Sequence, residues 1–226
     1  MKERHRPKTF GRRKGKTLRP QQQRVIDEIL PRLAVNPKEF GASIAREQSR
    51  CEVWLEIGFG GGEHLRLQAK RNAAVQFVGC EPFVNGVAKL LRAVEDDNLV
   101  NVRVHVGDAM ELVRELPGAS IGRIYLLYPD PWPKPKQRKR RIINDDNLAQ
   151  LARILKPGRE LRFATDIDDY CAWTLARLRA SHEFSWDPGN ATDWLTPWAD
   201  WEPTRYEEKA RREGRQSAYL TFRRLG

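Results

Sequence analysis

The chain has 226 residues and a net charge of +11, with 41 Lys and Arg against 30 Asp and Glu. This length suits one substantial domain, and no apolar run approaches the roughly 18 residues that a membrane-spanning helix needs. Three scattered cysteines without a CxxC pair, and four histidines without ligand spacing, argue against a structural metal site. They favour a reducing, cytoplasmic environment.

The positive charge is concentrated in two segments. Residues 1–20 carry nine Lys and Arg with one Glu, and residues 134–141 carry six cations and no acid. Such concentration is typical of a surface that binds a phosphate backbone. We predict a disordered basic arm over residues 1–20, because so polar a segment cannot bury a core. A solubilising tail, a targeting segment and an auxiliary nucleic-acid-binding arm all fit it. Residues 21–226 are predicted to form a single domain.

Predicted strands alternate with predicted helices along the domain. Residues 21–34 favour a short helix ended or kinked at Pro31, and residues 35–50 favour a loop with a weak amphipathic piece. A first strand begins at Cys51, and further strands are predicted at 76–81, 101–108, 121–128, 160–165 and 217–224. Helices are predicted after the glycine-rich turn and at 84–94, 145–155 and 168–180, with a stop signal at Lys156-Pro157-Gly158. This alternation predicts a parallel sheet with right-handed crossovers.

The first strand leads into a glycine-rich turn, Gly58-Phe59-Gly60-Gly61-Gly62. Glycines permit a tight turn and a close approach of the backbone to a ligand at the helix N-terminus. A dinucleotide fingerprint needs a glycine where Glu63 stands, and a carboxylate there disfavours a pyrophosphate. The pattern E-x-G-x-G-x-G from Glu56 instead resembles the S-adenosylmethionine loop of class I methyltransferases, whose ligand carries a cationic sulfonium.

Acids end the first three predicted strands, which supports a nucleoside cofactor. Glu56 would lie near the ammonium or methionine end, where its charge is favourable. Glu81 can bond both ribose hydroxyls, and Asp108 could accept a hydrogen bond from the adenine amine. The alternative is that these carboxylates only cap helices.

The fourth strand leads into the most distinctive stretch of the chain, Pro129-Asp130-Pro131-Trp132-Pro133-Lys134-Pro135. Proline fixes its own φ and pushes the preceding residue toward extended conformations. We therefore expect a stiff, extended loop that separates Asp130 from Lys134 by roughly 12 Å. Open α/β sheets bind ligands at the carboxyl ends of their strands. The loop beside the basic run is thus a candidate site, rather than a turn followed by solvated charges.

Four motifs resemble, in content and order, those of the bacterial tRNA (guanine-N7-)-methyltransferases over about residues 51–222. They are the glycine turn 56–63, the proline motif 129–134 with Lys139-Arg140-Arg141, Ala164-Thr165-Asp166, and Thr204-Arg205-Tyr206-Glu207. The resemblance implies an α/β, Rossmann-like class I methyltransferase fold with a seven-stranded, mostly parallel sheet and helices on both faces. It also implies methylation of N7 of a variable-loop guanosine in tRNA by S-adenosylmethionine, without a metal.

The resemblance further implies roles for individual residues. Cofactor contacts are expected of Glu56, Gly58, Glu81, Asp108 and Asp130, the last of which is also implied to be catalytic. Substrate contacts are expected of Lys134, Asp166, Thr204, Arg205, Tyr206 and Glu207. N7 of guanine has a free lone pair and loses no proton on methylation, so the transfer needs alignment more than a general base. We therefore interpret Asp130 as an acceptor that orients the guanine N1–H and amino edge. For Asp166, a salt bridge with a nearby arginine is an equal alternative.

Some residues depart from the family pattern. Pro135 and Gln137 stand where basic residues are usual, Arg205-Tyr206 replaces Lys-Phe, and Arg215 stands where His is common. Near the C-terminus, three tryptophans recur at helical spacing that Pro197 interrupts, namely Trp194, Trp198 and Trp201. We favour core or lid packing for them over stacking on bases.

Two other functions stay open on the sequence. The Asp-Pro-Trp loop also resembles that of exocyclic-amine methyltransferases, which act on adenine and cytosine. A non-catalytic RNA-binding module on the same fold is the second alternative, although three strand-end acids speak against it. The expected partner is tRNA, with no membrane and no obligate protein partner, and the chain is expected to be a monomer or a homodimer.

Overall fold

The computed structural model describes residues 15–47, 52–190 and 192–226. The helices are α1 (Pro20–Glu28), α2 (Leu30–Leu33), α3 (Pro37–Glu47), α4 (Glu63–Arg71), α5 (Val84–Asp96), α6 (Ala109–Glu115), α7 (Asp145–Ile154), α8 (Asp168–Ala180) and α9 (Arg205–Arg212). The strands are β1 (Glu52–Ile57), β2 (Val75–Cys80), β3 (Val102–His105), β4 (Ile121–Leu127), β5 (Leu155–Thr165), β6 (Phe184–Ser185) and β7 (Ala218–Arg224). Short 3-10 helices cover Pro135–Arg140 and Asp193–Leu195.

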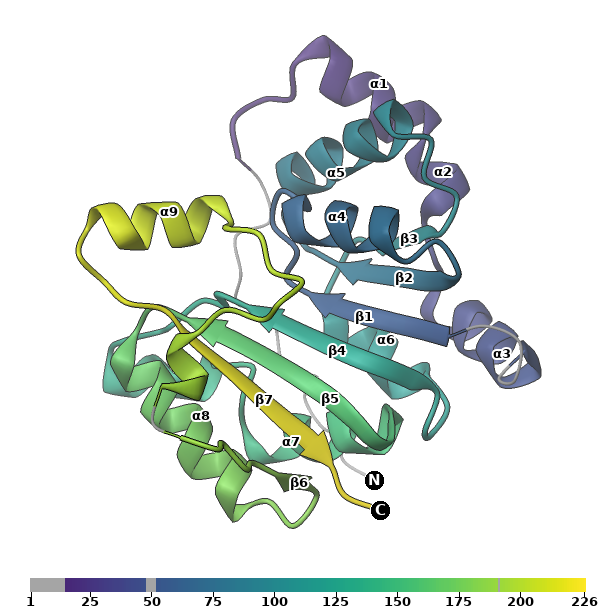
Figure 1. Cartoon of the computed structure of the whole chain (residues 1–226). Coiled ribbons are helices and arrows are strands. Elements are labelled where there is room, and N and C mark those ends of the chain that lie inside the picture. The colour runs from purple at the N-terminus through teal and green to yellow at the C-terminus, as the bar shows by residue number, and fades with distance from the viewer. Residues whose placement is uncertain (1–14, 48–51, 191) are drawn as a thin grey trace.

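The strands form one seven-stranded sheet in the order β3-β2-β1-β4-β5-β7-β6 (Figure 1). Neighbours from β3 to β5 pair in parallel, while β7 pairs antiparallel with β5 and β6. The predicted seven-stranded, mostly parallel sheet is therefore confirmed. Strand order reverses between β1 and β4, and such a switch point opens a crevice at the carboxyl ends of the strands.

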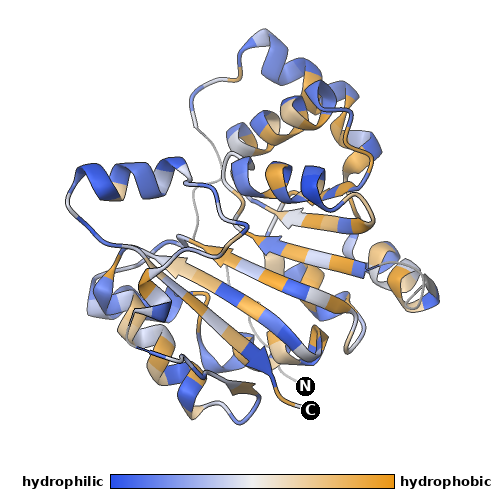
Figure 2. Ribbon diagram, in the orientation of Figure 1, coloured by the Kyte–Doolittle hydropathy of each residue, from blue (hydrophilic) through white to orange (hydrophobic). Residues whose placement is uncertain are grey.

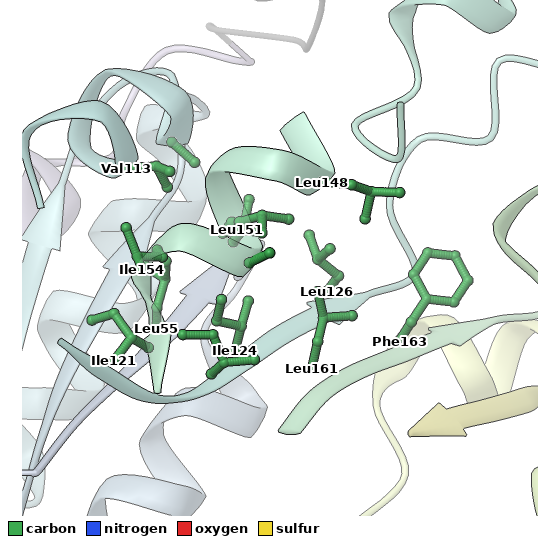
Figure 3. Close-up of a cluster of buried hydrophobic side chains, with 14 of the residues drawn as sticks. Leu55, Val113, Ile121, Ile124, Leu126, Leu148, Leu151, Ile154, Leu161 and Phe163 are labelled. Atoms are coloured by element: carbon green, nitrogen blue, oxygen red, sulfur yellow. The ribbon is translucent and has the colours of Figure 1, made fainter. Parts of the chain in front are cut away.

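Helices cover both faces of the sheet, as predicted. On one face, strand residues such as Leu55, Ile124 and Phe163 pack with Leu148 and Leu151 of α7 (Figure 3). On the other face a second cluster joins α4 and α5 to β2 and β3. The central strand β4 is accordingly buried along most of its length, and the helices turn apolar sides inward (Figure 2).

Several elements differ from their predicted bounds. The N-terminal helix breaks at Ile29, where α1 gives way to α2, so Pro31 lies inside α2. Residues 37–47 form the full helix α3, and α6 was not predicted because its seven residues are too short for a clear period. Helix α7 ends at Ile154 and β5 begins at once, with the Lys156-Pro157-Gly158 signal inside the strand. The pairing of β4 with β5 shifts register there, which accommodates the extra residues.

The described part of the chain begins at residue 15, within the predicted basic arm. Residues 1–14 of the predicted basic arm, like Cys51, lie outside the described residues. Within residues 15–20, Asn85 accepts a hydrogen bond from Gly15 N–H at 2.9 Å and donates one to the Lys16 carbonyl at 2.8 Å. Pro20 already begins α1. In the described ranges, the helices are too short or too polar to cross a membrane.

Candidate active site

The glycine-rich turn joins β1 to α4 at the switch point. Gly58, Gly60 and Gly62 have φ values of 77°, 57° and 78°, in the left-handed region that favours glycine. A Cβ at Gly62 would lie 2.6 Å from Leu90, whereas one at Gly58 would meet nothing within 4 Å. The turn is therefore packed on its α5 side and open at Gly58, where we predicted contact with a cofactor.

Glu81 ties this turn to the end of β2. Its Oε2 accepts a hydrogen bond from the Gly60 N–H at 2.8 Å, and its Oε1 accepts one from the Phe83 N–H at 2.9 Å. Burial raises the pKa of Glu81, the Asp130 and Glu56 carboxylates raise it further, and the two backbone hydrogen bonds oppose the shift. The three carboxylates thus lie close enough for their charges to interact.

Glu56 is buried at the end of β1 and held by a histidine. Its Oε2 lies 2.7 Å from Nδ1 of His64, which is itself buried on the first turn of α4. The His64 ring contacts Tyr125 edge-on, with centroids 4.6 Å apart, and lies 5.4 Å from Trp201. Sequence reasoning missed His64, although its position two residues after Gly62, in the first turn of the predicted helix, was a usable signal.

Asp108 follows β3 and caps α6. Its Oδ1 accepts a hydrogen bond from the Met110 N–H at 3.0 Å. The capping role that we set against a cofactor role is therefore realised at this position. Contact with the adenine amine stays a prediction for Asp108.

Asp130 lies on the rim of the site, the edge of the sheet where the parallel strands end, at the start of the loop after β4. Its side chain reaches the surface, yet the surrounding protein removes enough water that burial raises its pKa. Among the described residues, no cation offsets this shift. Burial raises the pKa of Tyr206, and the Glu81 and Asp130 charges raise it further. A cluster of acids with this deficit of positive charge suits a cationic ligand.

The proline-rich loop is not uniformly extended, and this prediction was wrong. Tyr128 and Trp132 precede prolines, yet their φ values are +49° and +41°. Tertiary contacts hold Tyr128 in this conformation, because it donates its N–H to the Ala164 carbonyl at 2.8 Å and its hydroxyl to Ser217 Oγ at 2.9 Å. Residues Pro135–Arg140 then coil into a 3-10 helix. Such backbone strain persists only where surrounding contacts enforce it.

The six cations of residues 134–141, which we predicted to form a phosphate-binding surface, differ in their surroundings. Arg138 and Arg141 both pair with Asp169 of α8, and the Arg140 guanidinium lies 4.9 Å from the centroid of the Trp132 ring. The exposed cations of the run are its lysines: Lys134, Lys136 and Lys139. Lys134, the predicted substrate contact, is therefore accessible at the start of the 3-10 helix.

Helix α9 brings a predicted substrate segment back to the glycine turn (Figure 1). Thr204 caps the helix by accepting the Glu207 N–H at 3.3 Å. Arg205 pairs with Glu63 at 2.6 Å between Nε and Oε1. The Tyr206 ring lies over Gly60, because a Cβ at Gly60 would be 3.6 Å from its Cε2. Two residues predicted to bind substrate thus contact the turn predicted to bind the cofactor.

Glu207 faces inward from α9. It is buried, its Oε2 accepts a hydrogen bond from Trp201 Nε1 at 2.6 Å, and its Oε1 accepts one from Arg211 Nη2 at 3.0 Å. Glu207 thus holds α9 against the aromatic residues that lie over β4 and β7. Any contact of Glu207 with substrate stays a prediction.

The three tryptophans pack against the protein, as we favoured, although no helix joins them. Trp198 donates its Nε1–H to Thr221 at 2.8 Å and contacts Trp201 with centroids 5.5 Å apart. Trp194 packs on Trp186, with centroids 5.4 Å apart. The helical spacing had no structural meaning, because Trp194 lies in the three-residue 3-10 helix Asp193–Leu195, which ends before Pro197.

Asp166 forms the salt bridge that we held as its alternative role. Its Oδ2 lies 2.7 Å from Nε of Arg215, the residue that stands where the family commonly has His. The pair joins the end of β5 to the segment before β7. A role of Asp166 in substrate binding stays a prediction.

Apart from the exposed Lys134, the predicted site residues fall into two groups. Those that converge on the switch point between β1 and β4 are Glu56, Gly58, Glu81, Asp130 and Tyr206. Those that serve caps, ion pairs or docking contacts in the structure are Asp108, Asp166, Thr204, Arg205 and Glu207. In the described part of the chain, no cluster of three His, Cys, Asp or Glu side chains is arranged to hold a metal ion.

Comparison with known proteins agrees with this geometry. The model of a family described as "Putative methyltransferase" matches residues 50–220. A tRNA (guanine-N(7)-)-methyltransferase of Nitrobacter hamburgensis is 50% identical over 218 residues, spanning 95% of this chain and 86% of that protein.

Among solved structures, an antibiotic-related methyltransferase superposes with a TM-score of 0.57 at 16% identity, over 84% of this chain and 95% of that one. A 16S rRNA (adenine(1408)-N(1))-methyltransferase from Catenulisporales acidiphilia, solved with S-adenosylmethionine, gives a TM-score of 0.55 at 14% identity, over 85% and 92% of the two chains. These likenesses show a shared methyltransferase fold. The sequence identity goes further, and the chain belongs to the tRNA (guanine-N(7)-)-methyltransferase family.

Proposed function

We propose that this protein transfers the methyl group of S-adenosylmethionine to N7 of a guanosine in the variable loop of tRNA, in the cytoplasm. The observation that carries the proposal is the meeting of Glu56, Glu81 and Asp130 at the switch point, beside the open backbone of Gly58. Burial and mutual repulsion raise the pKa of Glu81, and burial raises that of Asp130. A cationic cofactor would stabilise both carboxylates in their charged form and so lower both pKa values. Family membership supplies the substrate class.

The residues at the switch point fit this cofactor. Gly58 leaves open space above the turn, and Glu56 and Glu81 are held rigidly beside it by His64 and by backbone N–H groups. We assign Glu56 to the ammonium end and Glu81 to the ribose, with Asp108 near the adenine. When bound, the cofactor supplies an electrophilic methyl group on a sulfonium. The protein supplies a preorganised electrostatic environment that needs no rearrangement during the reaction.

Asp130 aligns the acceptor base in this proposal. Guanine N7 loses no proton on methylation, so a carboxylate at this position serves best by accepting hydrogen bonds from the N1–H and amino groups. Its charge also stabilises the cationic product. Removal of water from the crevice strengthens both interactions. Tyr206 lies above Gly60 and beside Asp130, where it closes one side of the crevice.

The exposed lysines next to Asp130 supply the attraction for the tRNA backbone. Lys134, Lys136 and Lys139 extend from the 3-10 helix that continues the Asp130 loop. Phosphate contacts of this kind position a nucleic acid without reading its sequence. They bring the variable loop of the tRNA to the crevice, where the base contacts determine which atom is methylated.

The direct test incubates the full chain with unmodified tRNA transcripts and methyl-labelled S-adenosylmethionine. Labelled nucleosides are then identified, and chemical cleavage at N7-methylguanosine maps the modified position. We expect label at one variable-loop guanosine. Label on an adenine or cytosine amine would instead assign the exocyclic-amine reaction. Cofactor binding without label would reject tRNA as substrate, and no cofactor binding would leave an RNA-binding module.

A further inference from the structure

We propose that Arg141 is a positioning residue for the reaction, which fixes the Asp130 segment through Asp169 and does not contact tRNA phosphates. The sequence places Arg141 at the end of the basic run, where a phosphate contact was the natural expectation. In the structure, however, Arg141 is buried inside the protein. This inference rests on the proposed function, because it explains how the catalytic loop is held.

Arg141 is buried, with only 1% of its surface exposed. Its Nε–H donates a hydrogen bond to the Pro131 carbonyl at 2.8 Å, ten positions earlier in the chain. This carbonyl belongs to the peptide between Pro131 and Trp132, so the bond fixes the loop one residue after Asp130. An arginine buried this completely has no access to a phosphate, whereas its loss would free the start of the loop.

Helix α8 holds the Arg141 guanidinium from the other side. Its Nη2 forms an ion pair with Asp169, and its Cζ lies 4.7 Å from the ring centroid of Tyr170 and 5.0 Å from that of Trp173. The Arg141 guanidinium, which donates a hydrogen bond to Asp169 within this ion pair, is the main reason that the pKa of Asp169 is lowered. Trp173 in turn donates its Nε1–H to the Ile143 carbonyl at 2.7 Å. A buried cation needs partners of this kind, and here they connect the loop to a helix of the core.

The geometry of the guanidinium explains why arginine stands at this position. Nε donates to a carbonyl on the loop while Nη2 pairs with a carboxylate on α8, and the planar fork fixes the two partners relative to each other. The ammonium of lysine is a point charge that cannot set this angle. The strained φ of Trp132, +41°, adjoins the same peptide and needs such a constraint.

The test compares three single variants of the full chain. Arg141→Lys keeps the charge and loses the fork, and Asp169→Asn weakens the anchor. Arg179→Lys is the control, because Arg179 is exposed in the last turn of the same helix. The measurements are kcat and KM for tRNA, the affinity for tRNA as a function of salt concentration, and thermal unfolding.

We expect Arg141→Lys and Asp169→Asn to lower kcat by about 10- to 100-fold, the scale on which small misplacements of catalytic groups act. For Arg141→Lys, the tRNA affinity and its salt dependence should stay within about twofold of the wild type, because the charge is kept. Asp169→Asn removes a negative charge beside Arg138, so its tRNA affinity should equal or exceed that of the wild type. Arg179→Lys should match the wild type. A kcat for Arg141→Lys within about twofold of wild type would overturn the inference. So would a loss confined to tRNA affinity.

Hydrogen–deuterium exchange separates this inference from the proposed function, since it requires neither substrate nor turnover. We expect faster amide exchange over residues 130–141 in Arg141→Lys and Asp169→Asn, with unchanged exchange in the strands. Unchanged loop exchange in both variants would reject the positioning role even if the enzyme methylates tRNA. Faster loop exchange in an enzyme that does not methylate tRNA would reject only the proposed function.

Discussion

The rim of the site has two halves that are held in place differently: the acids Glu56 and Glu81 at β1 and β2, and the Asp130 loop after β4. At β1 and β2, the acids are held within the single unit β1–α4–β2 and the residues that follow it, with Glu81 bound to the backbone of Gly60 and Phe83 and Glu56 bound to His64. At β4 and β5, the loop after Leu127 is shaped by partners far away in sequence. The cofactor half is thus preformed by local contacts, whereas the substrate half depends on tertiary anchors.

This difference has a consequence for function. Local, buried hydrogen bonds give the cofactor half a fixed geometry before any ligand binds. The substrate half carries strained backbone at Tyr128 and Trp132 and exposes its lysines, which suits a surface that receives a large polyanion. Substitutions in the first half should act on cofactor affinity, and substitutions in the second half on turnover and tRNA binding.

The largest effect is expected from Asp130→Asn, which keeps the shape of the side chain and removes its charge. Turnover with tRNA should fall by about 100-fold, because electrostatic alignment of the base is lost. Asp146→Asn, at an exposed acid of α7, is the matched control. Initial rates with methyl-labelled S-adenosylmethionine measure the effect, and near-normal turnover of Asp130→Asn would reject the role of Asp130.

The pH dependence of turnover by the wild-type enzyme should reflect the ionisation of Asp130. Asp130 acts as a carboxylate and burial raises its pKa, so turnover should fall as the pH drops through this raised value. A raised pKa also means that the folded protein holds the proton more tightly than the unfolded chain. Ionisation of Asp130 therefore costs stability as the pH rises through that window. At neutral pH, cofactor-free Asp130→Asn should unfold at the same or a higher temperature than wild type, and a clearly lower one would contradict this.

A smaller effect is expected from Glu81→Gln in the preformed half. The amide removes the charge and can accept only one of the two backbone N–H bonds, so affinity for S-adenosylhomocysteine should fall by about 30-fold. Isothermal titration calorimetry measures the affinity directly. Glu39→Gln, on exposed α3 at the opposite end of the strands, serves as control (Figure 1). If Glu81→Gln changed tRNA affinity and left cofactor affinity intact, the division of the rim would be wrong.

Tyr206→Ala tests the place where the two halves meet. The ring covers Gly60 and shares its surroundings with Glu81, so its removal should weaken cofactor binding about fivefold through lost contact area. Tyr206→Phe keeps the ring and should bind the cofactor like the wild type. Calorimetry again gives the comparison, and equal affinity of the alanine and phenylalanine variants would show that the ring does not cover the cofactor.

The smallest effect is expected from Lys139→Ala on the exposed part of the basic run. Loss of one phosphate contact should weaken tRNA binding by about threefold at moderate salt and reduce the salt slope by about one. Turnover at saturating tRNA should not change. Lys38→Ala, on α3, is the control for a lysine far from the rim. A fall in kcat without a change in salt slope would place Lys139 among the positioning residues beside Arg141.

Local patterns were read correctly from the sequence. The strand–glycine turn–helix unit was predicted correctly, because hydrophobic period and glycine act within a few residues. The cofactor contacts of Glu56, Glu81 and Asp108 stay predictions. Patterns whose meaning depends on distant partners were misread. The proline rule predicted extended backbone at Tyr128, where Ser217 and Ala164 hold it at positive φ.

The sequence by itself determined the class of fold, the turn and the strand-end acids, because hydrophobic period, glycine and strand-end position act within a few residues. It also determined the family, through motifs in a fixed order. Only the tertiary structure decided which charges face solvent. Arg141 and Lys139 are alike in the sequence, yet one is buried against Asp169 and the other is exposed. Burial depends on elements brought together from distant parts of the chain, and no local pattern encodes it.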